Sequence, residues 1–176
     1  MLRVAYNALL HLALPLLPLR LWWRGRKEPG YRTHVGERFG AYARRPDRPV
    51  IWIHAVSVGE TRAAQPLVEA LASRFPDHTL LLTTMTATGR ATAESLYGAR
   101  ATVAFLPYDY AWAVRRFLAH FEPRLGVIME TEIWPNLVRG ARQAKVPVVL
   151  ANARLSPKSA RGYARVAALT RAALAD

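Results

Sequence analysis

Polar residues able to take part in chemistry gather in three stretches, and each stretch directly follows an apolar run. The stretches are residues 57–60, residues 83–90, and residues 130–136 together with residues 152–159 after the next apolar run. In open α/β sheets, ligands bind outside the carboxyl ends of the strands. If the apolar runs are parallel strands, the three stretches meet at one edge of the sheet and form one candidate site.

The first stretch places Ser57, Gly59 and Glu60 between an expected strand and an expected helix. A carboxylate there can act as a general base that takes a proton from an attacking hydroxyl. Gly59 allows a tight turn or the close approach of a ligand. The alternative is structural, because an acidic residue in the first turn of a helix is stabilised by the free N–H groups and the helix dipole. Spacing alone leaves both roles of Glu60 open.

The second stretch combines Thr86 and Thr88 with Gly89 and Arg90 at the expected start of a helix. Backbone N–H groups at a helix start, together with an arginine, can hold a phosphate or a carboxylate. A threonine at this position can equally serve as the N-cap of the helix. The second stretch is therefore either an anion-binding loop or a plain helix cap.

The third stretch has two carboxylates, Glu130 and Glu132, directly after an apolar run. They can pair with Arg154 or Lys158 of the following stretch, or they can bind a substrate. The alternative is an acidic pair at the N-terminus of the next helix. Asn152, Arg154 and Lys158 are candidate substrate-binding residues beside the two glutamates.

Several other kinds of site are excluded by the sequence. The chain has no cysteine, which removes disulfides, thiolate zinc sites and cysteine nucleophiles. His54 lies inside an apolar run with no second histidine at ligand spacing, so we expect a hydrogen-bonded core residue and no metal site. The Gly-x-Ser-x-Gly, Gly-x-Gly-x-x-Gly and Walker patterns are also absent.

The elements that position these residues alternate along the chain. Apolar runs predict strands at residues 50–53, 79–83, 101–106, 125–129 and 146–150. Helical spacing predicts helices at residues 60–74, 87–96, 109–121, 134–144 and 157–174. Such alternation predicts an α/β domain over residues 50–176, with a mostly parallel, Rossmann-like sheet and helices on both faces.

The N-terminal stretch, residues 2–23, is strongly apolar and predicts a membrane anchor over residues 1–27. Its uncharged window between Arg3 and Arg20 is 16 residues long, whereas a straight spanning helix needs about 20. Pro15 and Pro18 are expected to kink or end a helix. The alternative is an ordinary core helix. Residues 28–49 are polar and turn-rich, and they predict a short helix and a linker.

The formal net charge of +13 is densest directly after the apolar N-terminus. This placement suits anionic lipid headgroups, and the positive flank puts the following domain on the cytoplasmic side of a membrane. No helix carries a dense stripe of arginine and lysine, and no aromatic–basic strand motif is present, so we expect no nucleic-acid partner.

Four motifs together resemble a known family. They are WIHAVSVGE at 52–60, TMTATG at 84–89, ETEIWPNL at 130–137 and NARLS at 152–156. In combination they are similar to the 3-deoxy-D-manno-octulosonic acid (Kdo) transferases of lipopolysaccharide synthesis. The resemblance runs from the N-terminal anchor to the end of the chain.

This resemblance implies a glycosyltransferase of the two-domain GT-B type, with this chain as its N-terminal, acceptor-binding half. The C-terminal domain, which holds most of the donor site, is expected to be missing, so the chain alone should not turn over. The implied reaction transfers Kdo from CMP-Kdo to the lipid A precursor, lipid IVA. It is implied to be inverting and metal-independent, with no cofactor, on the cytoplasmic face of the inner membrane.

In the family, the glutamate matching Glu60 is the proposed catalytic base, and the glutamate matching Glu130 is also important to the site. The resemblance therefore favours the catalytic role of Glu60. The competing hypothesis is a non-catalytic, membrane-tethered Rossmann-like module that binds an anionic lipid or a partner protein.

Overall fold

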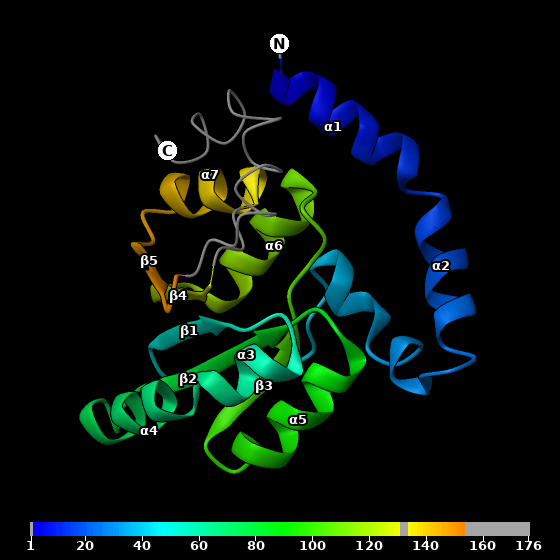
Figure 1. Ribbon diagram of the computed structural model, residues 1–176. Helices are drawn as coiled ribbons and strands as arrows, with labels where there is room; N and C mark the ends of the chain where they lie inside the picture. Colours follow the sequence, from blue (N-terminus) through cyan, green and yellow to red (C-terminus); the bar gives the residue numbers. More distant parts are fainter. Residues whose placement is uncertain (1, 131–133, 154–176) are drawn as a thin grey trace.

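The computed structural model describes residues 2–130 and 134–153, apart from the side chain of Leu2 (Figure 1). Its strands are β1 (Val50–His54), β2 (Thr79–Thr84), β3 (Ala101–Phe105), β4 (Pro123–Met129) and β5 (Val148–Ala151). Its α-helices are α1 (Leu2–Ala13), α2 (Leu16–Arg24), α3 (Val58–Ala63), α4 (Gln65–Arg74), α5 (Ala87–Tyr97), α6 (Ala111–Phe121) and α7 (Pro135–Gln143). Two 3-10 helices, η1 (Pro29–Tyr31) and η2 (Val35–Phe39), lie between α2 and β1.

The five strands form one parallel sheet in the order β3-β2-β1-β4-β5. This confirms the Rossmann-like α/β fold expected from the alternating pattern. The chain runs outward from β1 to β3 and then returns to place β4 on the other side of β1. The carboxyl ends of β1 and β4 are therefore the point where the strand order reverses, which is where ligands bind in sheets of this kind.

Helices cover both faces of the sheet (Figure 1). Along β1 the side chains alternate between two cores, because successive residues of a strand point to opposite faces. Val50 and Trp52 belong to the core under α6 and α7, whereas Ile51 and Ile53 belong to the core under α4 and α5. Both faces of β1 are buried, which explains why it reads as a continuous apolar run.

Gly126 in β4 leaves room for the indole ring of Trp52 in β1. A Cβ atom at this position would lie 2.7 Å from Cε3 of Trp52. Trp52 is completely buried, and its ring also meets the ring of Phe117 of α6 edge-on at 5.1 Å. The missing side chain at position 126 is therefore part of the packing of β1 against β4.

One predicted helix is divided in two. The helix expected at residues 60–74 is α3 followed by α4, with the break at Ala64. Pro66 explains the break, because it has no N–H group to donate to the carbonyl four residues earlier, and it fits well in the first turn of a new helix. The helix expected at residues 157–174 lies outside the described residues.

The apolar N-terminal stretch forms two helices that are bent by 58° at the break between them. The break falls at Leu14 and Pro15, where a kink was expected, and Pro18 lies in the first turn of α2. Among residues 2–130 and 134–153, no single helix is long and apolar enough to cross a membrane. The bent pair α1–α2 meets the length and composition requirement together.

Residues 28–49, expected as a short helix and a linker, contain the two 3-10 helices and pack against the domain. Arg38 of η2 is 1% exposed. Glu37 accepts a hydrogen bond from the backbone N–H of Phe105 at 2.7 Å. The segment therefore takes part in the tertiary structure at the end of β3.

Candidate active site at the carboxyl edge of the sheet

Glu60 lies at the carboxyl end of β1, in the first turn of α3. Its Oε2 accepts a hydrogen bond from the backbone N–H of Val56 at 2.7 Å, and its Oε1 accepts one from the hydroxyl of Ser57 at 3.0 Å. Ser57 is the N-cap of α3 and accepts in turn from the backbone N–H of Glu60. These bonds form a variant of the capping box, in which the glutamate side chain reaches the N–H of the residue before the N-cap serine and the serine hydroxyl itself.

The capping box holds the Glu60 carboxylate in one place while the residue is only 7% exposed. These two contacts orient the carboxylate. The same contacts are also expected if Glu60 only stabilises the start of α3, so they agree with the structural role as well. Gly59 is exposed beside it, and a Cβ there would meet only Ser57 Oγ, at 3.9 Å, so this glycine is not required by packing.

Thr86 is the N-cap of α5, which supports the plain-cap interpretation of the second stretch. Its Oγ1 accepts from the N–H of Gly89 at 3.0 Å and donates to the carbonyl of Val56 at 3.3 Å. The second bond joins the turn after β2 to the turn that holds Glu60. Gly89 allows this contact, because a Cβ there would lie 2.7 Å from Thr86 Oγ1 and 3.2 Å from the Val56 carbonyl. Thr88 is exposed on the same turn.

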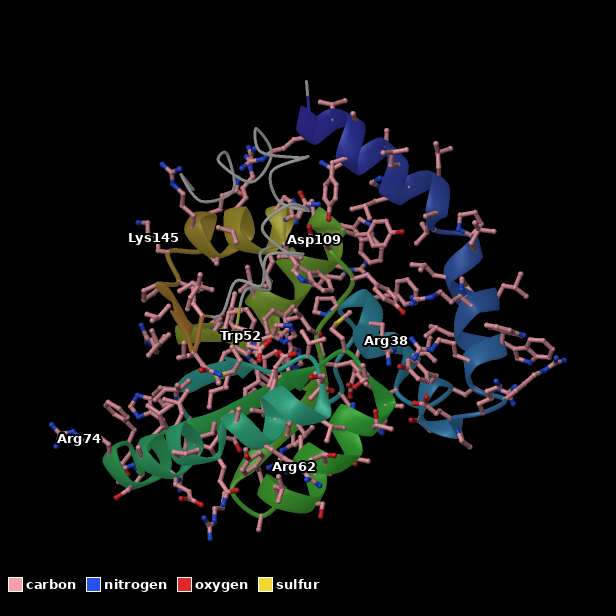
Figure 2. All side chains as sticks on the ribbon, in the orientation of Figure 1. Arg38, Trp52, Arg62, Arg74, Asp109 and Lys145 are labelled. Carbon is pink, nitrogen blue, oxygen red and sulfur yellow. The ribbon has the colours of Figure 1, made fainter. Side chains whose placement is uncertain are left out.

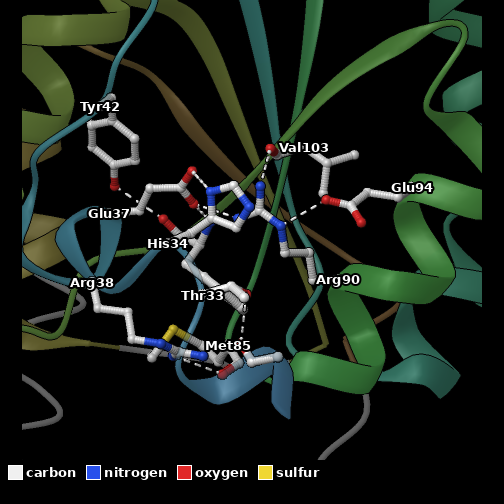
Figure 3. Close-up of polar contacts among 11 residues, drawn as sticks. Thr33, His34, Glu37, Arg38, Tyr42, Met85, Arg90, Glu94 and Val103 are labelled. Carbon is white, nitrogen blue, oxygen red and sulfur yellow. Dashed lines mark hydrogen bonds and ion pairs between the residues drawn. The ribbon is translucent and has the colours of Figure 1, made fainter. Parts of the chain in front are cut away.

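Arg90 is occupied by protein contacts. Its guanidinium pairs with Glu37 at 2.5 Å and with Glu94 at 2.7 Å, and it donates to the carbonyl of Val103 at 3.3 Å (Figure 3). The group also lies 4.8 Å from the centre of the Phe105 ring. These contacts make Arg90 a tie between α5, η2 and β3, and its expected role in substrate binding stays a prediction.

Glu37 and Arg38 connect η2 to the edge of the sheet and to two of its loops, and neither was predicted as a site residue. Arg38 Nη1 donates to the carbonyl of Met85 at 3.0 Å, and its own carbonyl accepts from the N–H of Tyr108 at 2.9 Å. The guanidinium lies 3.7 Å from the centre of the Phe105 ring, and burial lowers the pKa of Arg38. In the sequence, Glu37 and Arg38 are two charged residues inside a turn-rich stretch. This pattern is equally typical of a solvated linker, so it could not identify them as residues with tertiary contacts.

Glu130 and Asn152 occupy matching positions after β4 and β5. Both have left-handed backbone conformations, with φ of 58° for Glu130 and 52° for Asn152. The N–H of Glu130 donates to the carbonyl of Ala151 at 2.8 Å, so the two turns lie side by side. A non-glycine residue in this conformation is under strain, and such residues concentrate at functional sites. Glu132, Arg154 and Lys158 lie outside the described residues.

Asp109, after β3, is a further buried carboxylate at this edge. Its two oxygens accept the backbone N–H groups of Asn136 at 2.9 Å and Leu137 at 2.8 Å, which are free donors at the start of α7. The hydroxyl of Tyr6 in α1 donates to the same carboxylate at 2.9 Å, and the Asn136 amide donates to Oδ1 of Asn7 at 2.8 Å. We call these five residues the Asp109 latch. Burial raises the pKa of Asp109 to about 6.

His54 is a hydrogen-bonded core residue, as expected. It is completely buried, with Nδ1 at 2.9 Å from the hydroxyl of Thr83. The same hydroxyl accepts from the indole N–H of Trp52 at 2.7 Å. Burial lowers the pKa of His54 to about 4, so the imidazole is neutral near pH 7. Within the described part of the chain, no three His, Asp or Glu side chains are grouped to hold a metal ion.

Comparison with known proteins agrees with the motifs and the fold. A family model described as 3-deoxy-D-manno-octulosonic-acid transferase (kdotransferase) matches residues 33–176. The chain is 45% identical to the 3-deoxy-D-manno-octulosonic acid transferase of Bordetella pertussis, over 98% of this chain and 42% of that protein. It is 38% identical to the Haemophilus influenzae protein of the same name, over 94% of this chain and 39% of that protein.

A plant relative extends the match. The probable mitochondrial 3-deoxy-D-manno-octulosonic acid transferase of Arabidopsis thaliana is 37% identical, over 88% of this chain and 35% of that protein. The chain thus spans about two fifths of the length of the curated relatives it matches. Because the family model covers most of the sequence, including all the strands and the buried Glu60, this chain belongs to the 3-deoxy-D-manno-octulosonic acid transferase family.

Proposed function

We propose that this chain is the acceptor-side half of a GT-B glycosyltransferase that moves Kdo from CMP-Kdo to a lipid A precursor. Glu60 is the general base of this proposal. The observation that carries it is the placement of Glu60, a residue that is 7% exposed and whose carboxylate is oriented by hydrogen bonds, at the carboxyl end of β1, where the strand order reverses. A site there faces the region where ligands bind in parallel sheets.

The proposed chemistry needs little from the protein beyond orientation and a base. Glu60 takes the proton of the acceptor hydroxyl as the hydroxyl oxygen attacks the sugar carbon that carries the CMP ester. The bond from that carbon to the phosphate oxygen breaks, and CMP leaves with the electron pair. The attack comes from the side opposite the leaving group, so the proposed transfer inverts configuration. The proposed transfer is also metal-independent. Glu130 and Asn152 are proposed to contact the substrates from the neighbouring turns.

We propose that the protein works on the cytoplasmic face of the inner membrane, with α1 and α2 docked on the lipid. Large apolar side chains of both helices are exposed, namely Val4, Leu9, Leu12, Leu16, Leu19, Trp22 and Trp23. Arginines flank this apolar stripe, and Arg26 lies 4.2 Å from the centre of the Trp22 ring. Aromatic rings beside cationic groups suit the headgroup level of a bilayer.

The test of the catalytic proposal is transfer from CMP-Kdo to lipid IVA by the protein from the complete reading frame. Glu60→Gln keeps the size and one acceptor oxygen but removes the base, so kcat should fall by about 10²- to 10⁴-fold. Glu69→Gln is the matched control, because Glu69 is exposed on α4 and bonds only Gln65 among the described contacts. If Glu60→Gln turned over at the same rate as Glu69→Gln, the proposed role of Glu60 as the general base would be wrong.

A second candidate function is a non-catalytic, membrane-tethered module for an anionic lipid or a partner protein. The capping box favours it, because that motif accounts for the position of Glu60 without any chemistry. The same assay separates the two functions. Absence of product with the complete wild-type protein, together with retained binding to vesicles, would support the module.

A further inference from the structure

A groove of about 620 Å³ runs between the N-terminal part of α1 and the outer sides of α6 and α7. It lies on the outer side of the α6–α7 layer, whereas Glu60 follows β1 at the start of α3 on the sheet. Its size is that of a typical small-molecule pocket. The groove exists because the Asp109 latch holds α1 against the starts of α6 and α7.

The groove combines an apolar floor with a positive rim. Its small or aliphatic lining residues, which we call the apolar floor, are Val4, Ala111, Leu118, Ala119, Gly140 and Ala144. Three arginines also line it, Arg3, Arg115 and Arg139, which we call the arginine rim, and none of its described lining residues is acidic. Arg115 and Arg139 are exposed, and neither has an ion pair within residues 2–130 and 134–153. Such a groove fits a ligand with an apolar chain and an anionic head.

We propose that this groove binds one molecule of an anionic phospholipid. The phosphate lies at the arginine rim, where guanidinium groups can form charge-assisted hydrogen bonds with it. One acyl chain lies along the apolar floor. The proposal rests on the membrane docking proposed above, but it does not depend on Kdo transfer.

A lipid is favoured over other occupants because the groove continues into the apolar stripe. Val4 belongs to both: it lines the groove and is 73% exposed on the side that is proposed to meet the bilayer. A lipid that enters from the membrane plane therefore keeps its chain in apolar surroundings throughout. Charge complementarity points to an anionic headgroup, since a zwitterionic one would bring a second positive charge to the arginine rim.

The first test measures binding of the complete protein to vesicles of dioleoylphosphatidylcholine alone and with dioleoylphosphatidylglycerol. A basic residue near an anionic membrane surface contributes about 1 kcal/mol, so Arg115→Gln and Arg139→Gln should each weaken binding to the mixed vesicles about fivefold. The matched controls are Arg62→Gln and Arg74→Gln, whose side chains lie on the far side of the molecule from α1 (Figure 2). Binding to pure phosphatidylcholine should be equal in all variants.

The second test separates a bound lipid from general attraction to a charged surface. The protein is extracted from mixed vesicles with detergent, and native mass spectrometry counts the phosphatidylglycerol molecules that remain bound. Wild type should keep one. Ala119→Trp fills the groove without changing its charge and should keep none, whereas Ala70→Trp on the exposed side of α4 should behave as wild type.

The outcomes distinguish the two proposals. If wild type binds neither kind of vesicle, the proposed membrane docking is wrong. If it binds but all four arginine variants weaken it equally, or if Ala119→Trp keeps its lipid, the groove is not a phospholipid site. Retention of phosphatidylcholine in place of phosphatidylglycerol would also overturn the proposal, because it removes the role of the arginine rim.

Discussion

Replacing Asp109 by Asn should change how the stability of the protein depends on pH. Asp109 is 4% exposed, and burial raises the pKa of its carboxyl group from 3.8 to about 6. The folded state therefore binds more protons than the unfolded state between these two values. By linkage, a carboxyl group of this kind makes the free energy of unfolding fall as the pH rises through that range.

The expected size of this effect follows from the two pKa values. The difference between 3.8 and about 6 corresponds to about 3 kcal/mol of unfolding free energy. The side-chain amide of the Asp109→Asn variant cannot titrate, so the variant loses this dependence while keeping the shape of the side chain. The amide also exchanges one carboxylate acceptor for a donor facing the start of α7, which lowers stability by an amount that does not vary with pH.

The assay is urea unfolding of wild type and Asp109→Asn at several pH values from 3.5 to 7. The stability of wild type relative to the variant should fall by about 3 kcal/mol across this range and stay constant above it. Asp77→Asn is the control, because Asp77 is exposed between α4 and β2 and its replacement should leave the pH dependence unchanged. A relative stability that rises with pH would refute the reasoning, since the hydrogen bonds to the carboxylate would then outweigh its burial.

Three further substitutions probe the core and the edge of the sheet. Glu37→Gln removes one of the two carboxylate partners of the buried Arg90 and leaves Glu94, so denaturant unfolding should show a loss of about 1–3 kcal/mol, and an unchanged midpoint would refute a stabilising role of this ion pair. Because burial lowers the pKa of His54 to about 4, the free energy of unfolding of wild type should fall by about 3 kcal/mol relative to His54→Gln as the pH falls from 6.5 to 4. An unchanged difference between the two proteins would show that the histidine is not protected from protonation. Gly126→Ala should lower stability by about 1–3 kcal/mol in thermal unfolding because its Cβ overlaps the indole beside it, whereas Gly59→Ala, which has open space, should not.

The strands were predictable because their signal is local. Each is a short apolar run, and all five predicted strands overlap observed ones. The division of one helix at Ala64 was also present in the sequence as Pro66, but helical spacing on both sides of the proline concealed it. The capping box was visible as a serine and a glutamate three residues apart, although Glu60 was interpreted as a general base or an acidic helix start and not as the partner of Ser57.

The remaining features of the site depend on contacts between distant residues. Asp109 caps a helix that begins 26 residues later, and Glu37 pairs with Arg90 across 53 residues. Neither pair leaves a pattern in its own segment, because each partner alone is an ordinary polar residue in a turn. Strand order is equally non-local, so the sequence predicted a parallel sheet but not the position of β1 between β2 and β4.

The Asp109 latch has a consequence for synthesis of the chain. Tyr6 is separated from Asp109 by 103 residues, and Asn7 is separated from Asn136 by 129. At translation rates of about 5–20 residues per second, α1 precedes its partners by roughly 5 to 26 seconds. Two apolar helices therefore leave the ribosome long before the domain that receives them exists. During that interval their exposed apolar side chains have no folded domain to pack against. The order of translation therefore favours early capture of α1 and α2 by any apolar surface that is present, which for the membrane docking proposed above would be the bilayer.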